Sequence, residues 1–476
     1  MQFSRTSTLF IIGIYLIGIQ HSFSQLSNLN YLIEMNTSFS TNETLPFWIY
    51  SNKFGNVPKT EHLLVTTSLF SSSKKTNSNV AFSYKASFTG YAINSKKSIL
   101  VNELYGSLHF KNFNVDLGVK HADILWEGLS SSNGNIAFST NARSFPGYNF
   151  STLNYIKFPF FRKWLSFKAT YGDYLLNDNR FVDNTLLHSK SLHFKSKINS
   201  KLDFTLDLNH YVQWGGTSPN YGKQPSGIND YLKVITGSSG GKNANGGDQI
   251  NTLGNTIGVY LLQLNSKGTK TNWSIYYSHP FEDRSGREFM NYPDALYGFF
   301  IDFKKPRGII SHILTEITYT KHNSGPSPHY YDEDGGYHAA SGRDDYFNNF
   351  VYNSGWTYFG NTIGSPYFTT VPVNEDGITK GVILGDNRFI AINIGWKGML
   401  QNMKYKTIFS NTTYTGWFDN EYIKKPKQFS GIFEVIIPKK EKFPIEITLG
   451  IAFDTGTYKP VNFGGFFKLT KNGTFN

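Results

Sequence analysis

The stretch IEITLGIAFD, residues 445–454, places an apolar side chain at every second position and a small or polar one between. A helix repeats every 3.6 residues and a strand every two, so this period predicts a β-strand with one apolar face. The same alternation recurs at residues 80–88, 202–209 and 390–397. Such strands suit a soluble β-sandwich as well as a membrane barrel, so alternation alone leaves both open.

The composition of the chain agrees with an all-β fold. Of its 476 residues, 17% are Phe, Trp or Tyr, 17% are charged and 44 are Gly. Aromatic residues fit a pleated sheet, whereas helical surfaces need Ala, Glu, Lys and Leu. The absence of Cys excludes disulfides and thiolate sites. The net charge of +12 comes from scattered basic residues rather than one patch, so we expect no nucleic-acid partner.

The N-terminal segment predicts export. Arg5 precedes an apolar run at residues 9–19, and Ser22-Phe23-Ser24 is suited to cleavage. We therefore expect residues 1–24 to be a cleaved signal peptide and residues 25–476 to form the mature domain. No later stretch approaches the roughly 20 apolar residues that a spanning helix needs.

The lengths of the connections between strands separate the two fold classes. Strands are predicted at residues 28–38, 62–70, 80–93, 99–110, 113–122, 150–158, 164–175, 188–198, 202–214, 257–264, 273–283, 296–304, 308–322, 383–398, 403–418, 429–438, 445–454 and 460–470. Every long connection, at 39–61, 123–149, 215–256 and 323–382, follows an odd-numbered strand. A barrel with short periplasmic turns and long extracellular loops has this arrangement. The sequence predicts an all-β, transmembrane, antiparallel up-and-down barrel of about 18 strands with long extracellular loops.

Motifs in the predicted loops and near the strand ends follow one another through most of the chain. They include Pro46-Phe47-Trp48, Trp126-Glu127-Gly128-Leu129-Ser130-Ser131, Asn141-Ala142-Arg143, Leu187-His188-Ser189-Lys190, Trp214-Gly215-Gly216-Thr217-Ser218-Pro219, Pro280-Phe281-Glu282-Asp283, Asn291-Tyr292-Pro293-Asp294, Gly342-Arg343-Asp344-Asp345-Tyr346-Phe347-Asn348-Asn349 and Ser354-Gly355-Trp356. In these motifs the chain resembles the capsule assembly Wzi family of outer-membrane proteins, in its Bacteroidetes-type form.

The resemblance implies a barrel in the cell outer membrane that binds or organises capsular or surface polysaccharide, as a non-enzymatic lectin. Enterobacterial members of the family are similar in carrying a helical segment that blocks the inner end of the barrel. No amphipathic helix of that length follows residue 25 here. The sequence therefore does not decide whether the lumen is open or plugged.

A sugar site needs aromatic faces together with polar groups that satisfy the sugar hydroxyls. The 323–382 connection is rich in both. The expected glycan-binding residues are Trp214, Asp283, Asp294, Arg343, Asp344, Asp345, Tyr346 and Trp356. The alternative for each is structural, with the aromatics packing the loop as a lid and Arg343 pairing with its acidic neighbours. Near strand ends, Trp126, Trp214, Trp273 and Trp417 also fit an aromatic girdle at the membrane interface.

The sequence offers little support for catalysis. Gly237-Ser238-Ser239-Gly240-Gly241 fits the G-x-S-x-G pattern, but it lies in mid-connection and lacks the strand and helix that a nucleophile elbow needs. No paired-histidine metal motif is present. We expect no enzyme activity, cofactor or metal.

The expected partners are outer-membrane lipid and capsular or surface polysaccharide. The alternative function is an outer-membrane porin or transporter for oligosaccharides or other polar solutes, which a polar lumen would also suit.

Overall fold

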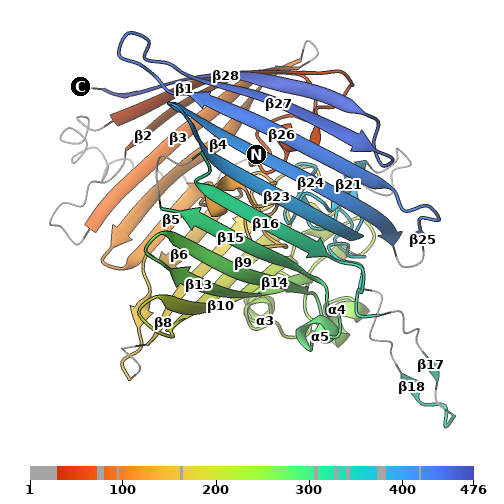
Figure 1. The fold of residues 1–476 in the computed structure, drawn as a ribbon. Coiled ribbons are helices and arrows are strands. Elements are labelled where there is room, and N and C mark those ends of the chain that lie inside the picture. The colour runs from red at the N-terminus through yellow and green to blue at the C-terminus, as the bar shows by residue number, and fades with distance from the viewer. Residues whose placement is uncertain are drawn as a thin grey trace, which may run out of the picture.

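The computed structural model describes residues 29–71, 80–93, 96–160, 164–304, 309–325, 330–331, 333–338, 344–372, 382–417 and 420–475. Most of them form one closed antiparallel β-barrel (Figure 1). The predicted signal peptide lies outside the described residues. No helix within these ranges has the length and apolar character that crossing a membrane requires.

Eighteen strands build the wall of the barrel, as the sequence predicted. They are β1 (Leu29–Ser40), β2 (Leu63–Ser71), β3 (Val80–Ile93), β4 (Lys96–Phe110), β5 (Phe113–Val119), β6 (Pro146–Thr152), β8 (Leu165–Leu175), β9 (Leu186–Lys197), β10 (Leu202–Trp214), β13 (Asn255–Lys267), β14 (Thr271–Phe281), β15 (Ala295–Phe303), β16 (His312–Tyr319), β23 (Arg388–Leu400), β24 (Met403–Trp417), β26 (Lys427–Ile437), β27 (Glu446–Gly456) and β28 (Asn462–Thr474). The short strands β7 (Ile156–Lys157) and β25 (Asn420–Glu421) extend the pairing of β8 and β24. The ring closes because β1 pairs with both β2 and β28.

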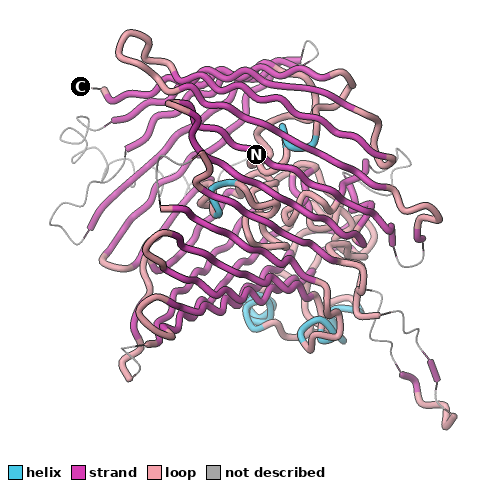
Figure 2. Tube along the Cα trace, viewed as in Figure 1, coloured by secondary structure: helices cyan, strands magenta, loops and turns pink. Residues whose placement is uncertain are grey.

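All the long connections lie at one rim, which also agrees with the prediction. Asn30 pairs with Thr474, so the two ends of the barrel chain meet at the opposite rim. In outer-membrane barrels the rim with long loops is extracellular. The helical elements lie in these connections (Figure 2): α2 (Phe47–Tyr50), a 3₁₀ turn (Trp126–Gly128), α3 (Ile228–Thr236), α4 (Gly246–Ile250) and α5 (Arg284–Arg287). So do four small ladders: β11 (Thr217–Ser218) with β12 (Gly222–Lys223), β17 (Tyr330–Tyr331) with β18 (Tyr337–His338), β19 (Thr357–Tyr358) with β20 (Asn361–Thr362), and β21 (Thr369–Pro372) with β22 (Val382–Asp386).

The alternation of each strand separates an apolar outer surface from a polar lumen. The outer row of the wall exposes large apolar side chains, among them Leu208, Ile275 and Ile451. This exposure is what a lipid-facing surface requires. In the lumen row, Asp203 pairs with Lys195 at 3.3 Å. The predicted polar row therefore faces inward.

Three segments from the extracellular rim fold back into the lumen. We call residues 41–62, 120–145 and 344–368 the plug. Their apolar residues form one buried cluster with the inner wall, which includes Trp48, Ile136, Phe347, Trp356 and Phe368. Figure 2 shows these connecting segments inside the ring of strands. The alternative interpretation of the sequence was that the last of them packs as a lid, and the structure places this segment inside the barrel.

Candidate functional site

One buried carboxylate fixes the plug to the barrel wall. Glu316 of β16, which is 1% exposed, accepts hydrogen bonds from Ser130 Oγ at 2.6 Å and Ser131 N at 2.7 Å. The Tyr276 hydroxyl also donates to it. Trp126 stacks on the Tyr276 ring at 4.5 Å between centroids. The predicted membrane-girdle position of Trp126 is therefore wrong, because its ring lies inside the barrel.

The three plug segments are joined to one another by hydrogen bonds. Trp356 Nε1 donates to the Ala137 carbonyl at 2.6 Å. Ser139 Oγ donates to the Gly364 carbonyl at 2.6 Å. The first segment joins through Phe54 N, which donates to the Thr140 carbonyl at 2.7 Å. The plug consequently behaves as one packed unit rather than as three separate loops.

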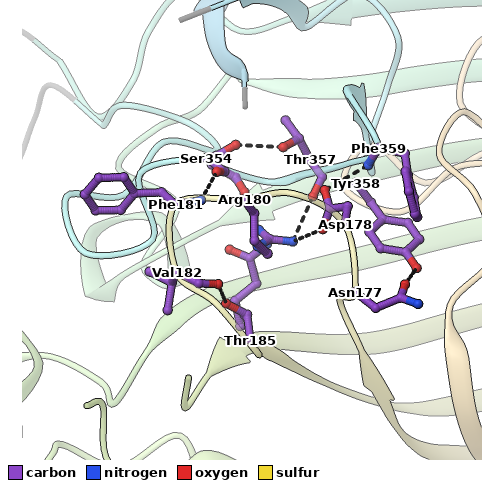
Figure 3. A network of polar contacts seen from close by, with 12 residues as sticks. Asn177, Asp178, Arg180, Phe181, Val182, Thr185, Ser354, Thr357, Tyr358 and Phe359 are labelled. Atoms are coloured by element: carbon purple, nitrogen blue, oxygen red, sulfur yellow. Dashed lines mark hydrogen bonds and ion pairs between the residues drawn. The ribbon is translucent and has the colours of Figure 1, made fainter. Parts of the chain in front are cut away.

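A second network ties the plug to the connection between β8 and β9 (Figure 3). The buried Arg180 guanidinium donates to Asp178 Oδ1 at 3.2 Å and to the Thr357 carbonyl at 3.4 Å. Phe359 N donates to Asp178 Oδ2 at 2.9 Å. A buried charge is tolerated only when it is paired in this way. The network fixes the backbone of Phe359, whose ring stays exposed.

Three of the predicted glycan-binding residues meet at the base of the longest connection. The Tyr346 hydroxyl donates to Asp294 Oδ2 at 2.8 Å. Asp294 also accepts from the backbone of Asn323 at 2.6 Å. Ser324 Oγ donates to Asp344 Oδ2 at 2.5 Å. Asp294 and Tyr346 are fully buried. The cluster therefore forms a buried junction between the connection at 282–294 and the connection between β16 and β23.

Burial changes the acidity of this cluster. It raises the pKa of Asp294 to about 6, although the backbone N–H groups of Asn323 and His322 lower it. Burial also raises the pKa of Asp344 to about 6, and the carboxylates of Asp283 and Asp294 add to that effect. The protonated forms are favoured because charge is costly in a poorly hydrated site.

We expect this junction to be tighter at pH 5 than at pH 7.5. When the junction opens, Asp294 regains an ordinary pKa of about 4. The open state therefore loses its proton as pH rises past about 4, and the closed state only past about 6. Stability that is fully present below about pH 4 is thus lost across this window, by about 2 kcal/mol for two pKa units after allowance for solvent, and about half of this loss falls between pH 5 and pH 7.5. Hydrogen exchange of residues 344–358, corrected for intrinsic rates, measures the change.

The matched control for this pH effect is Asp294→Asn, which removes the titrating group but keeps an acceptor for the same backbone donors. It should reduce the pH dependence of exchange and leave the part that Asp344 contributes, because burial raises the pKa of that carboxyl as well. An unchanged pH profile in the variant would show that Asp294 does not cause the effect.

Of the other predicted site residues, Asp283 and Asp345 lie beside this cluster, whereas Trp214 and Trp356 lie elsewhere. Asp283 caps α5 by accepting from Ser285 N at 2.8 Å. Asp345 is exposed and accepts from Asn348 Nδ2 at 3.0 Å. Trp356 is buried in the plug, and Trp214 lies at the end of β10. Arg343 lies outside the described residues. As sugar ligands, all eight residues stay predictions.

An outward-facing cleft lies where the plug meets the extracellular ends of several strands. Its volume is about 1140 Å³. The aromatic part of its lining includes Tyr50, Tyr91, Phe359 and Tyr458. These residues come from segments that are far apart in the sequence, and the plug brings them together. A concave surface with several accessible aromatic rings is a typical ligand site.

The polar lining of the cleft carries more exposed cations than anions. Lys59, Arg143 and Lys459 line it with Glu43, and its amides include Asn361. The Arg143 guanidinium lies 4.1 Å from the centre of the Phe359 ring. Arg143 belongs to a motif that the sequence singled out, but its role in a cleft was missed. No local pattern could have shown that Arg143 and Phe359 are neighbours.

A smaller cavity of about 500 Å³ lies in the lumen on the other side of the plug. Its charged groups are largely paired with one another. Lys406 lies 2.8 Å and Lys53 3.4 Å from the Glu434 carboxylate. The cavity therefore has the character of a hydrated vestibule with balanced charge.

The G-x-S-x-G pattern has no catalytic geometry. Gly237 adopts a φ of 64° and caps the C-terminus of α3. The pattern thus follows a helix, whereas a nucleophile elbow follows a strand. The residues 237–241 form the loop that the sequence predicted.

Comparisons with known proteins agree with this architecture. The sequence model of a family described as capsule assembly protein Wzi matches residues 48–373. Among solved structures, the chain is similar to Wzi of Escherichia coli, an outer-membrane protein involved in group 1 capsule assembly and described as a carbohydrate-binding β-barrel. The two share 11% identity over 98% of this chain and 88% of that chain, with a TM-score of 0.58. At this identity the likeness shows the fold alone.

Other solved barrels match over similar lengths. OccAB4 of Acinetobacter baumannii shares 8% identity over 95% of this chain and 100% of that chain, with a TM-score of 0.46. OccK3 of Pseudomonas aeruginosa shares 8% identity over 96% and 98%, with a TM-score of 0.47. None of the curated proteins compared with the chain matches it.

Proposed function

The chain belongs to the capsule assembly protein Wzi family and is an outer-membrane β-barrel, and from that premise we propose that it binds capsular or surface polysaccharide in its outward-facing cleft. The binding is non-enzymatic and lectin-like. The single observation that carries the proposal is the cleft itself, with its aromatic rings and amides at the extracellular rim. Export through the signal peptide at residues 1–24 is part of the proposal.

The chemistry of the lining favours an acidic polysaccharide. Aromatic rings offer flat apolar faces to the C–H rows of a pyranose, and amides satisfy its hydroxyls. The exposed Lys59 and Lys459 and the half-buried Arg143 outnumber the acidic residues of the cleft, which are the exposed Glu43 and the buried Asp454. A guanidinium binds a carboxylate through two parallel hydrogen bonds. A glycan that carries uronic acids or other carboxylates therefore matches this surface better than a neutral one.

We expect Phe359→Ala and Arg143→Gln each to weaken binding of the purified acidic capsule by about tenfold, which corresponds to about 1.4 kcal/mol. Phe359 supplies an exposed ring and Arg143 a cation at the same point of the cleft. Binding is measured by calorimetry on the refolded protein. Heat-modifiable mobility on gels checks that the barrel is intact.

Two controls make this test specific. Tyr221→Ala removes an exposed aromatic from another extracellular connection, and it should leave affinity unchanged. Capsule whose carboxyl groups have been reduced should bind wild type more weakly and should lose the difference between wild type and Arg143→Gln. Full affinity in both cleft variants would contradict the proposal.

A diffusion channel is the other candidate function. The polar lumen would suit it, but the plug fills the lumen beneath the extracellular rim with packed side chains. The lectin-like role therefore has the stronger support, and the wild-type protein should give little conductance in planar bilayers.

A further inference from the structure

One extracellular connection folds over the outside of the barrel rather than into it. In β10, Tyr211 and Gln213 face the lumen, because Tyr211 accepts from the plug residue Asn135 at 3.0 Å and Gln213 donates to the Gly355 carbonyl at 3.2 Å. Neighbouring residues of a strand point to opposite faces. Val212 and Trp214 therefore face outward, in the same row as the lipid-facing Leu208.

Helix α3 covers this outward-facing row. Val212 and Trp214 are buried in a small apolar cluster with Val234 of α3 and with Leu253. The Trp214 ring stacks on Tyr231 at 5.2 Å between centroids. Figure 1 shows α3 and α4 along the lower edge of the barrel, beside β10 and β13. The helix thus lies on the outer wall, at the extracellular ends of the strands.

Polar contacts hold the helix in one orientation. The Tyr231 hydroxyl donates to Asp173 of β8, which also contacts His188 Nδ1 at 2.9 Å. Lys190 of β9 donates to the Ile235 carbonyl near the end of the helix. Asp173 and His188 pair across the strands and lie on the same outward face. These contacts fix the face of α3 that packs on the barrel wall. The opposite face of the helix therefore points away from the wall.

The adjacent connection 282–294 covers the wall in the same way. His279 of β14 lies in the outward row with Ile275, yet it is fully buried. Its Nε2 lies 2.9 Å from the Gly286 carbonyl, and its ring stacks on Phe289 at 4.5 Å. We call residues 228–250 and 284–292 the collar.

The side of the collar that points away from the wall exposes large apolar residues. Ile228 and Leu232, one helical turn apart on α3, are 73% and 54% exposed. Ile250 of α4 is 84% exposed. Phe289 and Met290 are exposed on the second connection. Such a patch on a protein surface marks an interaction site.

We propose that the collar lies in the interfacial layer of the outer leaflet, with Ile228, Leu232 and Ile250 in contact with lipid. The patch adjoins the outer wall, whose exposed apolar row already faces lipid, so the lipid-facing surface continues onto the collar. An amphipathic helix with its apolar edge toward the acyl boundary is a common membrane-surface element. The collar would make this sector of the wall sit deeper and more firmly in the leaflet than the others.

Because the chain has no Cys, single-cysteine variants give a direct test. We label Ile228→Cys and Leu232→Cys with an environment-sensitive dye and reconstitute the protein in phosphatidylcholine vesicles. Asn229→Cys, an exposed position on the same helix, is the water-facing control, and Ile275→Cys on the outer wall is the lipid-facing control. Nitroxide lipids should quench the dye at positions 228 and 232 at least about twofold more than at 229, as expected for interfacial side chains.

Aqueous iodide gives the reverse comparison. It should quench the dye at position 229 and leave positions 228, 232 and 275 protected. Equal iodide quenching at 228, 229 and 232 would overturn the proposal and place the helix in water. Protection from both quenchers together with an oligomeric species in detergent would also overturn it, because the patch would then face a second copy of the chain. Heat-modifiable mobility shows that each labelled barrel is folded.

Discussion

Replacing Glu316 with alanine is expected to loosen the plug and to turn a poorly conducting barrel into one that passes ions. Glu316 is the wall residue that accepts from both Ser130 and Ser131 of the plug. It also accepts a hydrogen bond from the Tyr276 hydroxyl, and Trp126 stacks on the ring of that tyrosine. A single substitution therefore removes the acceptor that orders the start of the 120–145 segment.

The energetic cost should be large for one side chain. Removing the carboxylate leaves Ser131 N and the Tyr276 hydroxyl buried without their acceptor, and each such group costs about 1–3 kcal/mol. We expect the plug to lose about 3 kcal/mol of stability in total. The wall should persist, because its inter-strand hydrogen bonds do not depend on this side chain.

Planar-bilayer recordings measure this prediction. Wild type should be quiet, and Glu316→Ala should show frequent openings together with faster proteolysis between residues 120 and 145. Asp203→Asn is the matched control, since Asp203 is a buried lumen carboxylate that pairs with Lys195 rather than with the plug. If Glu316→Ala stays as quiet as wild type, Glu316 is not needed to hold the plug. If wild type itself conducts, the lumen is open and the transporter function gains support.

The wall of the barrel could be predicted from sequence because its signals are local. Alternation along IEITLGIAFD defines the two faces of a strand, and connection lengths define the two rims. Boundaries were less secure at turns. The sixth strand was predicted at residues 150–158, whereas β6 covers Pro146–Thr152. The strand begins at Pro146, and a proline is tolerated as the first residue of a strand.

The plug and the cleft could not be predicted because they depend on contacts between distant segments. The bond from Trp356 to Ala137 spans 219 positions, and that from Ser139 to Gly364 spans 225. No periodicity reports such a contact. The aromatic and acidic composition of the 323–382 connection indicated a folded loop, yet it could not show that the loop enters the lumen.

Three of the predicted site residues lie close together in the structure. Asp294, Asp344 and Tyr346 meet at the base of the longest connection, and their motifs alone could not show this because the contacts join different connections. Trp214 lies apart from them because neighbouring residues of a strand point to opposite faces. Gln213 faces the plug, so Trp214 faces outward. A residue at a strand end can meet a girdle, a plug or a collar, and only the paths of the loops decide which.

Trp356→Ala is expected to lower capsule affinity at least as much as a change in the cleft lining, although Trp356 has no access to the cleft. Its ring is 0% exposed and lies 6.1 Å from that of Tyr211, and its Nε1 binds the Ala137 carbonyl. Emptying such a site costs about 3–5 kcal/mol. The loss falls on the plug, because the strands of the wall do not depend on this ring for their hydrogen bonds.

Phe359 follows Trp356 by three residues. Disorder at Trp356 should therefore let the Phe359 ring leave its position in the lining of the cleft. We expect capsule affinity to fall about tenfold, hydrogen exchange of residues 357–363 to rise, and heat-modifiable mobility to stay normal. Trp356→Phe keeps most of the packing volume. It should therefore show a much smaller loss of capsule affinity and a much smaller rise in hydrogen exchange. A loss of affinity without faster exchange would instead show that Trp356 contacts sugar directly. Unchanged affinity in Trp356→Ala would mean that the cleft does not need an ordered plug.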